Sequence, residues 1–204
     1  MAAELQPELQ VSKASTGFET RASYMKGVLA GVERRGRGLE RQLECTCPQT
    51  LSAIRTASQS EWLPHEVGLD MARGLERAIG IADTRAIYLE ACLLSFGSGV
   101  LGPLFGAAIR IFGPSPHLLA RWIPRAWNAV WRGCGELVVE EATPGFVRIH
   151  HVGIPRDAMF DAFLEVSAEC IGSIISGCQK KGSAIVERRD GSDPINYVLT
   201  WDEQ

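Results

Sequence analysis

The sequence has no charge excess and none of the motifs that mark the commonest chemistries. Its formal net charge is −3 at pH 7, whereas nucleic-acid-binding proteins usually carry a strong basic patch, so we expect no nucleic-acid partner. The G-x-S-x-G, H-E-x-x-H and G-x-x-x-x-G-K-[ST] motifs of serine hydrolases, zinc proteases and P-loop proteins are absent. Glu140 and Glu141 form a carboxylate pair, but neighbours on a strand point to opposite faces. The sequence therefore predicts no catalytic residues.

The chain also lacks a segment suited to crossing a membrane. No basic and apolar leader opens it. An uncharged run, residues 93–109, is shorter than the roughly 20 residues that a spanning helix needs, and glycines interrupt it. We therefore expect no membrane insertion, a cytoplasmic location, and a buried helix broken at Gly102 and Pro103.

Cysteines are present, but their spacing does not predict a metal site. Without a secretion signal, the six cysteines are expected to be reduced thiols. Cys45 and Cys47 are the one close pair, and they supply two of the four ligands that a structural zinc site uses. We expect no metal site and no cofactor, and the spacing alone leaves metal binding by this pair open.

The sequence does contain enough apolar residues for a substantial core, since 46% of the chain is hydrophobic. Residues 1–18 are polar without a sustained period, and we expect a disordered arm there. Residues 19–204 are expected to form a single domain with a helical part over residues 19–132. Within that part, apolar spacing predicts one helix from His65 to Gly80 and another that opens at Asp83.

The last third, residues 133–201, predicts two strands, one long helix and two further strands. Apolar residues at spacings of three and four predict that the helix runs from Pro155 to Lys180 and covers a sheet. His150 and His151 point to opposite faces of a strand, so they do not share a metal ion, and exposure to solvent is the expected role of a strand histidine. The predicted fold class is α+β, in which an N-terminal helical region packs with a four-stranded antiparallel sheet.

The most aromatic stretch supplies candidate binding residues. Residues 117–131 predict a helix that Pro124 interrupts, and its tryptophans recur at spacings of five and four. Core packing is the ordinary role of such a stripe, and the wall of a pocket between this helix, the long helix and the sheet is the alternative. The residues predicted to bind a ligand are Trp122, Trp127, Trp131, Phe160, Phe163 and Ile171.

The order of these predicted elements, and the residues that mark them, resemble those of a known family. The matching positions are Trp62, Pro64, Ser115, Pro116, Leu118, Leu119, Trp127, Gly133 or Gly135, Gly172, Gly177, Tyr197 and Trp201. Through them, residues 24–201 resemble a paralogous bacterial family abundant in myxobacteria. That family is related to the vinyl-reductase-like ligand-binding domains and to the haem-nitric-oxide-binding and Golgi-transport superfamily. Because most of these positions are structural, the resemblance implies a fold more than an activity.

The resemblance does not extend to the haem-binding motifs of that superfamily. Its haem-binding members use a proximal histidine and a Tyr-x-Ser-x-Arg motif, and none of Tyr24, Tyr88 and Tyr197 begins such a motif. His117 opens a helix and remains a candidate proximal ligand. Vinyl-reductase-like members often carry cysteines in the last hairpin, whereas residues 183–201 contain none. The resemblance therefore implies a ligand-binding domain without a haem.

Three functions compete at this point. The first is a non-catalytic sensor or regulatory module that binds a small apolar ligand in a pocket between the helices and the sheet. The second is a homodimeric protein-interaction scaffold with a filled core, and the third is an enzyme of unknown reaction. The helices carry more apolar surface than one four-stranded sheet covers, so we expect a homodimer formed by helices and allow a further protein partner. An open apolar cavity favours the first function, and a filled core favours the second.

Overall fold

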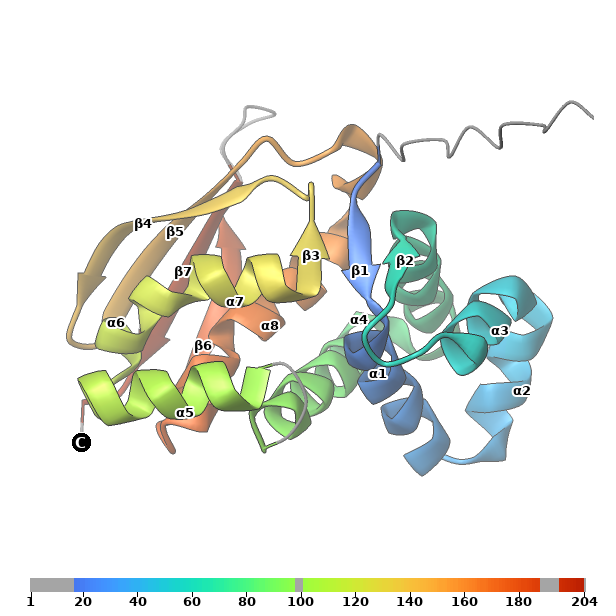
Figure 1. Ribbon diagram of the computed structural model, residues 1–204, viewed down its shortest axis with the longest axis horizontal. Helices are drawn as coiled ribbons and strands as arrows, with labels where there is room; N and C mark the ends of the chain where they lie inside the picture. The colour runs from blue at the N-terminus through green and yellow to red at the C-terminus, as the bar shows by residue number, and fades with distance from the viewer. Residues whose placement is uncertain (1–16, 98–100, 188–194, 204) are drawn as a thin grey trace, which may run out of the picture.

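The computed structural model describes residues 17–97, 101–187 and 195–203 (Figure 1). The helices are α1 (Ala22–Arg34), α2 (Arg37–Thr46), α3 (Pro48–Thr56), α4 (His65–Gly97), α5 (Leu101–Phe112), α6 (Pro116–Leu119), α7 (Ile123–Val130) and α8 (Asp161–Gly177), with 3-10 turns η1 (Ala120–Trp122) and η2 (Arg156–Ala158). The strands are β1 (Glu19–Arg21), β2 (Trp62–Pro64), β3 (Trp131–Arg132), β4 (Glu136–Thr143), β5 (Phe146–Val152), β6 (Gly182–Glu187) and β7 (Ile195–Trp201). The predicted arm, residues 1–18, lies almost wholly outside the described residues.

The larger sheet has four antiparallel strands in the order β4-β5-β7-β6. Ile149, Tyr197 and Val186 pair across β5, β7 and β6, so they share one face, and Ile149 and Tyr197 are fully buried there. Helix α8 packs against β6 and β7, while α2 and α3 lie at the opposite end of the molecule from this sheet (Figure 1). The predicted α+β fold class with a four-stranded antiparallel sheet is therefore confirmed.

Helix α8 is shorter than the sequence predicts. The turn η2 follows Pro155, and Phe160 has an extended backbone with φ −120° and ψ 156°, so the helix begins only at Asp161. Asp161 then lies in the first turn, where a carboxylate interacts favourably with the helix dipole. The apolar period of the helix was predicted correctly, but its first turn was placed too early because periodicity does not distinguish a 3-10 turn from an α-helix.

Strand alternation separates the two adjacent histidines of β5, as predicted. His150 is half-buried on one face, with Nε2 2.9 Å from Glu140 Oε2. His151 on the other face is fully buried, so the expected exposure to solvent is wrong for it. Its Nε2 lies 2.6 Å from the carbonyl oxygen of Cys134 and its Nδ1 lies 3.1 Å from the Tyr197 hydroxyl. These two contacts satisfy the buried ring.

Gly80 divides α4 into two helical segments, in agreement with the predicted stop. Its φ of 77° lies in the left-handed region, which glycine adopts at no steric cost. The segment after Gly80 packs on α1 and α8, and its residues Ile87 and Ala91 are fully buried. Helix α4 therefore joins the N-terminal helices to the C-terminal unit.

A second, three-stranded sheet in the order β2-β1-β3 was not predicted. Its strands have three, three and two residues, which is too short for an alternating pattern to show. Trp131, expected at the end of a helix, instead pairs with Thr20 in this sheet. The backbone of Trp131 is extended because α7 ends at Val130.

The uncharged run around residues 93–109 also differs from its prediction. Pro103 lies in the first turn of α5, so α5 begins at Leu101 and is not broken at Gly102 and Pro103. The helix is only partly buried, with Ala108 2% exposed and Ile111 64% exposed. No helix among the described residues combines the length and the apolar character that a membrane span requires.

The buried apolar residues form two clusters of unequal size. The main cluster runs from Phe18 to Trp201 and includes residues from both the helical part and the larger sheet. A satellite cluster around Ala108, Leu119 and Cys178 packs beside α5 and α6. The arrangement leaves α5 and α6 attached to the molecule by their own small core.

Candidate ligand cavity

A cavity lies between α5, α7 and α8, at the C-terminal end of α4. Its volume is about 80 Å³, which is room for a few water molecules. The residues that line it are Tyr24, Cys92, Phe96, Phe105, Ala108, Leu119, Trp122, Ile123, Ala126, Trp127, Val130, Trp131, Cys170, Ile171, Ser173 and Ile174. They come from both core clusters, so the cavity lies between the main core and the satellite core.

Four of the six residues predicted to bind a ligand line this cavity. Trp122, Trp127 and Trp131 approach it from η1, α7 and β3, and Ile171 approaches it from α8. The rings of Trp127 and Trp131 are 6.0 Å apart, with Trp127 in α7 and Trp131 in the extended strand that follows it. Both tryptophans line the cavity although only Trp127 lies in a helix, and binding itself stays a prediction.

The other two predicted residues lie outside the lining. Phe163 packs edge-on against the ring of Trp131, with ring centroids 5.3 Å apart, and so contacts a lining residue without lining the cavity itself. Phe160 lies near the start of α8, where the Arg73 guanidinium stacks 4.2 Å above its ring. Both were selected because they share the apolar face of the predicted helix, but that face is longer than the cavity.

The polar groups of the lining were missed by sequence reasoning. The Tyr24 hydroxyl lies 2.7 Å from the Cys170 sulfur and 4.0 Å from the Cys92 sulfur. The Ser173 hydroxyl donates to the carbonyl oxygen of Cys170 at 2.6 Å. These residues come from α1, α4 and α8, so no local pattern in the sequence connects them.

Burial keeps this polar cluster uncharged. Desolvation raises the pKa of the Tyr24 hydroxyl well above its usual value, and the neighbouring Cys170 and Cys92 thiols raise it further. Desolvation likewise raises the pKa of the Cys170 thiol. Because the thiolate is the nucleophilic form of cysteine, Cys170 is a weak nucleophile in this site.

Among the described residues, Trp127 is the one lining residue whose side-chain donor is buried and has no hydrogen-bond partner. Trp127 is 5% exposed, and its indole Nε1 makes no hydrogen bond to another described residue. The ring of His151 stands perpendicular to the indole, with centroids 5.0 Å apart, and is itself held by Tyr197 and Cys134. Buried polar groups are usually hydrogen-bonded, so this donor needs an explanation.

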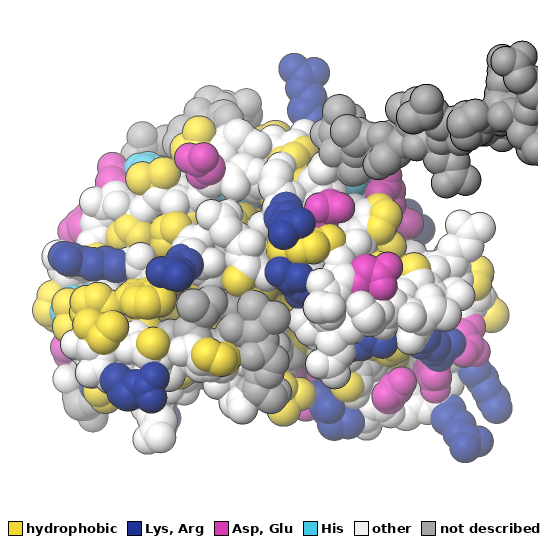
Figure 2. Space-filling view, in the orientation of Figure 1, with side chains coloured by type: hydrophobic (Ala, Val, Ile, Leu, Met, Phe, Trp, Pro, Cys, Tyr) yellow, Lys and Arg dark blue, Asp and Glu magenta, His cyan; other side chains and the backbone are white. Residues whose placement is uncertain are grey.

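The lining carries no formal charge, because none of its residues is Asp, Glu, Lys, Arg or His. Hydrophobic side chains also gather on the outer surface over α5, α6 and α7, the elements that close the cavity from one side (Figure 2). Among the described residues, no group of three or more His, Cys, Asp and Glu side chains could hold a metal ion. Cys45 is exposed and Cys47 is half-buried at the end of α2, away from the cavity lining.

Solved structures of H-NOX proteins share this fold. The unliganded Fe(II) H-NOX protein from K. algicida has a TM-score of 0.62 at 9% identity, covering 90% of this chain and 97% of that chain. The S. oneidensis H-NOX protein in its Fe(II)NO ligation state has a TM-score of 0.58 at 9% identity, covering 89% and 99%. An oxygen-binding H-NOX domain related to soluble guanylate cyclases has a TM-score of 0.53 at 8% identity, covering 89% and 94%. No family model and no curated protein matches the sequence, so at these identities the likeness shows the fold alone.

The residues of the cavity do not fit a haem. Haem iron takes an axial ligand such as histidine, a cysteine thiolate or a tyrosine, and no histidine is among the lining residues. Tyr24 and Cys170 do line the cavity, but their hydroxyl and thiol contact each other, and burial raises the pKa of both groups and so disfavours the deprotonated forms that bind iron. His117 lies outside the lining, with Nδ1 2.9 Å from the Ser115 hydroxyl. The lining also offers no Lys or Arg to pair with the carboxylates of a haem, and tryptophan side chains take up much of the wall. Chemistry through a haem therefore has no support from these residues.

Proposed function

We propose that this protein is a non-catalytic sensor or regulatory domain that binds a small apolar ligand in the cavity between α5, α7 and α8. The observation that carries the proposal is an open space with an almost entirely apolar lining in the middle of a closely packed fold. Protein interiors leave few voids larger than a water molecule, and ligand sites are mostly apolar with a few polar groups. The wall built from Trp127, Trp131 and Ile171 meets this description.

The position of the cavity supports a regulatory role. A ligand there contacts the main core through Trp127 and Ile174 and the satellite core through Ala108 and Leu119. Binding would therefore add contacts between the two clusters, beside the stacked rings of Phe96 and Phe105, and would favour the arrangement in which α5 and α6 pack on α7 and α8. The H-NOX structures that share the fold include proteins described with bound oxygen and with a Fe(II)NO centre. That fold thus accommodates ligands in other proteins.

The same cavity gives little support to the enzyme alternative. Its lining has no charged side chain, and the thiol and hydroxyl nearest the space have raised pKa values. General acid–base catalysis requires a group that exchanges a proton near the working pH. Tyr24 and Cys170 do not meet that requirement.

The proposal includes four statements of narrower scope. Residues 19–204 act as one domain, the chain belongs to the myxobacterial paralogous family that its sequence resembles, the protein works in the cytoplasm, and it forms a homodimer. Support for the single domain comes from the main cluster, which contains residues from α1 through β7.

A cavity-filling substitution tests the proposed site. Benzene is the probe, because buried apolar cavities in proteins bind it. We expect benzene to shift the methyl resonances of Ile171 and Ile174, which line the cavity, and Ala126→Leu to abolish this shift by occupying the space. The control is Ala86→Leu, which adds the same side chain at an exposed position of α4 and should leave binding unchanged. Absence of any shift in the unsubstituted protein, or an equal shift in Ala126→Leu, contradicts the proposal.

A further inference from the structure

We infer that the outer side of α7, together with the neighbouring face of the three-stranded sheet, binds an acidic segment of a partner protein, and that arginines there form ion pairs with its carboxylates. The arginines concerned, which we call the arginine surface, are Arg21 in β1, Arg121 in η1, Arg125 in α7 and Arg132 in β3. They lie outside the cavity lining, so the inference does not depend on the ligand proposed for the cavity.

The first observation is a long stretch of the chain without acidic residues. No Asp or Glu occurs between Glu90 and Glu136, and the cations of this stretch are four arginines, Arg110, Arg121, Arg125 and Arg132. Because the net charge of the whole chain is −3, the rest of the chain is acidic overall. Figure 2 shows the resulting row of dark-blue side chains, which runs from α6 over α7 to β3 and β1. The positive charge is thus concentrated on one face.

The second observation is that the protein leaves most of this charge unneutralised. Arg121 and Arg125 are exposed, and neither has an ion-pair partner among the described residues. Arg132 has Glu19, but its Nη1 lies 3.9 Å from Glu19 Oε2. Desolvation lowers the pKa of the Arg21 guanidinium, and the like charge of Arg132 lowers it further. An acidic partner would relieve this repulsion between neighbouring cations.

The third observation is that aromatic rings hold the guanidinium groups of this surface. Arg21 lies directly opposite Trp62 in the pairing of β1 with β2, and its guanidinium stacks 3.8 Å from the Trp62 ring. Arg132, in β3 on the other side of β1, stacks 3.9 Å from the same ring. Arg125 lies 5.5 Å from the Trp122 ring. A guanidinium held flat presents a fork of N–H groups that suits a carboxylate.

The spacing of the charges favours a segment with several carboxylates. Arg121 and Arg125 are four residues apart in a continuous helical stretch, so they are about 6 Å apart along its axis. Carboxylates one turn apart on a partner helix have the same spacing. A single phosphate group needs cations that converge on one point, whereas Arg132 lies seven residues beyond Arg125. An acidic protein segment therefore fits this surface better than one phosphate.

Helix α7 connects the arginine surface to the cavity. It supplies Ile123, Ala126 and Trp127 to the cavity lining, whereas Arg121 and Arg125 are exposed. Residues three and four apart share a side of a helix, so the lining residues and the arginines lie on different sides. A partner on the arginine surface would thus touch the helix that a cavity ligand touches. This connection gives the proposed sensor a route to an output.

A pair of peptides tests the inference. Both are short alanine-based helices, and every fourth position is Glu in one and Gln in the other. We expect the Glu peptide to bind in a fluorescence anisotropy titration, with an affinity that falls as salt is added, because exposed ion pairs are screened. The Gln peptide should not bind. Equal affinity for the two peptides overturns the inference, and so does binding to phosphatidylserine vesicles without binding to the Glu peptide, which would assign the surface to a membrane.

Substitutions locate the binding surface. Arg121→Gln together with Arg125→Gln should weaken binding of the Glu peptide about fivefold, since each exposed ion pair contributes modestly. The matched control is Arg37→Gln together with Arg41→Gln, which removes two exposed arginines, also four residues apart, from α2 at a distance from α7 (Figure 1). This control should leave the affinity unchanged. An unchanged affinity in the α7 pair, or an equal loss in the α2 pair, overturns the inference.

A charge-conserving change tests the role of the stacked guanidinium. Arg132→Lys keeps the positive charge but removes the planar fork that stacks on Trp62, so it should weaken binding of the Glu peptide about threefold. Unchanged affinity in Arg132→Lys would overturn recognition by a stacked guanidinium. Binding of benzene in the cavity is measured separately, so failure of the Glu peptide to bind overturns this inference and leaves the proposed function standing.

Discussion

Gly172 shows how one missing side chain allows α8 to approach the sheet. A Cβ atom at this position would lie 2.5 Å from the Cβ of Ala184 in β6, which is far inside van der Waals contact. Ala184 is itself 4% exposed, so neither residue has free space to move into. The close packing of α8 on β6 therefore depends on glycine at position 172.

We predict that Gly172→Ala lowers the free energy of unfolding by about 1–3 kcal/mol, because the added methyl forces α8 away from β6. The control is Gly38→Ala in the first turn of α2, where a Cβ would meet nothing within 4 Å. That change should stabilise the protein by up to about 1 kcal/mol, since alanine is the better helix former. Urea unfolding followed by circular dichroism measures both, and a neutral Gly172→Ala would show that the helix and strand separate at little cost.

At the residue scale, sequence analysis identified one wall of the cavity and missed another. Trp127 and Trp131 are near each other in the sequence and both line the cavity, although Trp131 lies in an extended strand and not in the helix that was predicted for it. Tyr24 and Cys170 meet at 2.7 Å although 146 positions separate them. Only tertiary packing, of α1 against α4 and of α4 against α8, brings such residues together, and no periodicity encodes it.

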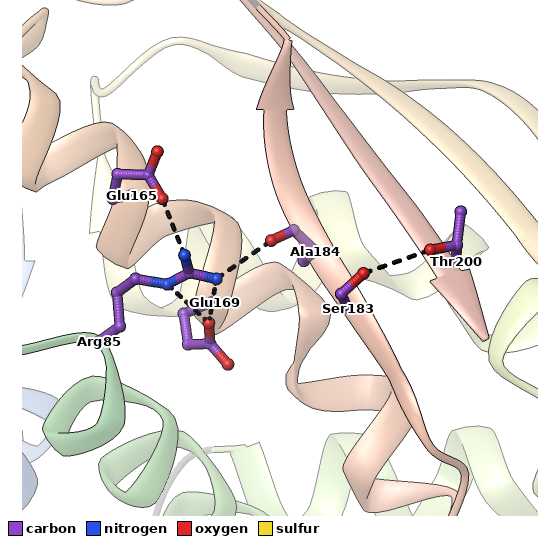
Figure 3. Close-up of polar contacts among 6 residues, drawn as sticks. All are labelled: Arg85, Glu165, Glu169, Ser183, Ala184 and Thr200. Atoms are coloured by element: carbon purple, nitrogen blue, oxygen red, sulfur yellow. Dashed lines mark hydrogen bonds and ion pairs between the residues drawn. The ribbon is translucent and has the colours of Figure 1, made fainter. Parts of the chain in front are cut away.

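At the scale of elements, Arg85 joins three parts of the fold (Figure 3). It extends from α4, and its Nε and Nη2 donate to Glu169 Oε2 of α8 at 3.0 and 2.8 Å. Nη1 lies 3.2 Å from Glu165 Oε2, and Nη2 also donates to the carbonyl oxygen of Ala184 in β6. One guanidinium thus connects α4, α8 and β6 at the boundary between the helical part and the sheet.

We predict that Arg85→Ala lowers the free energy of unfolding by about 1–3 kcal/mol, because it leaves two half-buried carboxylates and a carbonyl without their donor. Arg55→Ala is the comparison. Arg55 also pairs with two glutamates, Glu40 and Glu44, but its hydrogen bonds to them are exposed, whereas those of Arg85 are partly buried. Its loss should cost less than about 1 kcal/mol. Chemical denaturation measures both, and equal effects would show that Arg85 contributes no more than a surface ion pair.

The elements predicted correctly are those with a long repeating pattern or a clear stop signal. The larger sheet, most of α8 and the break at Gly80 belong to this group. The three-stranded sheet escaped prediction because its strands are too short to alternate visibly. Its stability comes from Phe18 and Trp131, whose rings are 6.0 Å apart, and thus from contacts between distant parts of the chain.

At the scale of the whole molecule, the exposed apolar residues bear on assembly. Leu93 and Ile111 are 36% and 64% exposed on α4 and α5, beside the elements that close the cavity. Ile185 is 50% exposed on β6, an edge strand of the larger sheet. Two kinds of interface are therefore available, one through helices and one through the sheet. Glu187 lies on β6, an edge strand, and it disfavours the second kind, because a charge on an edge strand discourages edge pairing.

We predict a homodimer whose interface is formed by helices around Ile111. Ile111 on α5 and Leu93 on α4 are both exposed apolar side chains, and a symmetric copy that covers them removes this apolar surface from water. Light scattering at micromolar concentration should give the mass of two chains, and Ile111→Glu should reduce it to one because it places a charge in the contact. Ile185→Glu makes the same change on the sheet and should leave the dimer intact. A single-chain mass at every concentration contradicts the dimer. Dissociation by Ile185→Glu alone would assign the interface to the sheet. In that case the dimer would form without the helices that close the cavity.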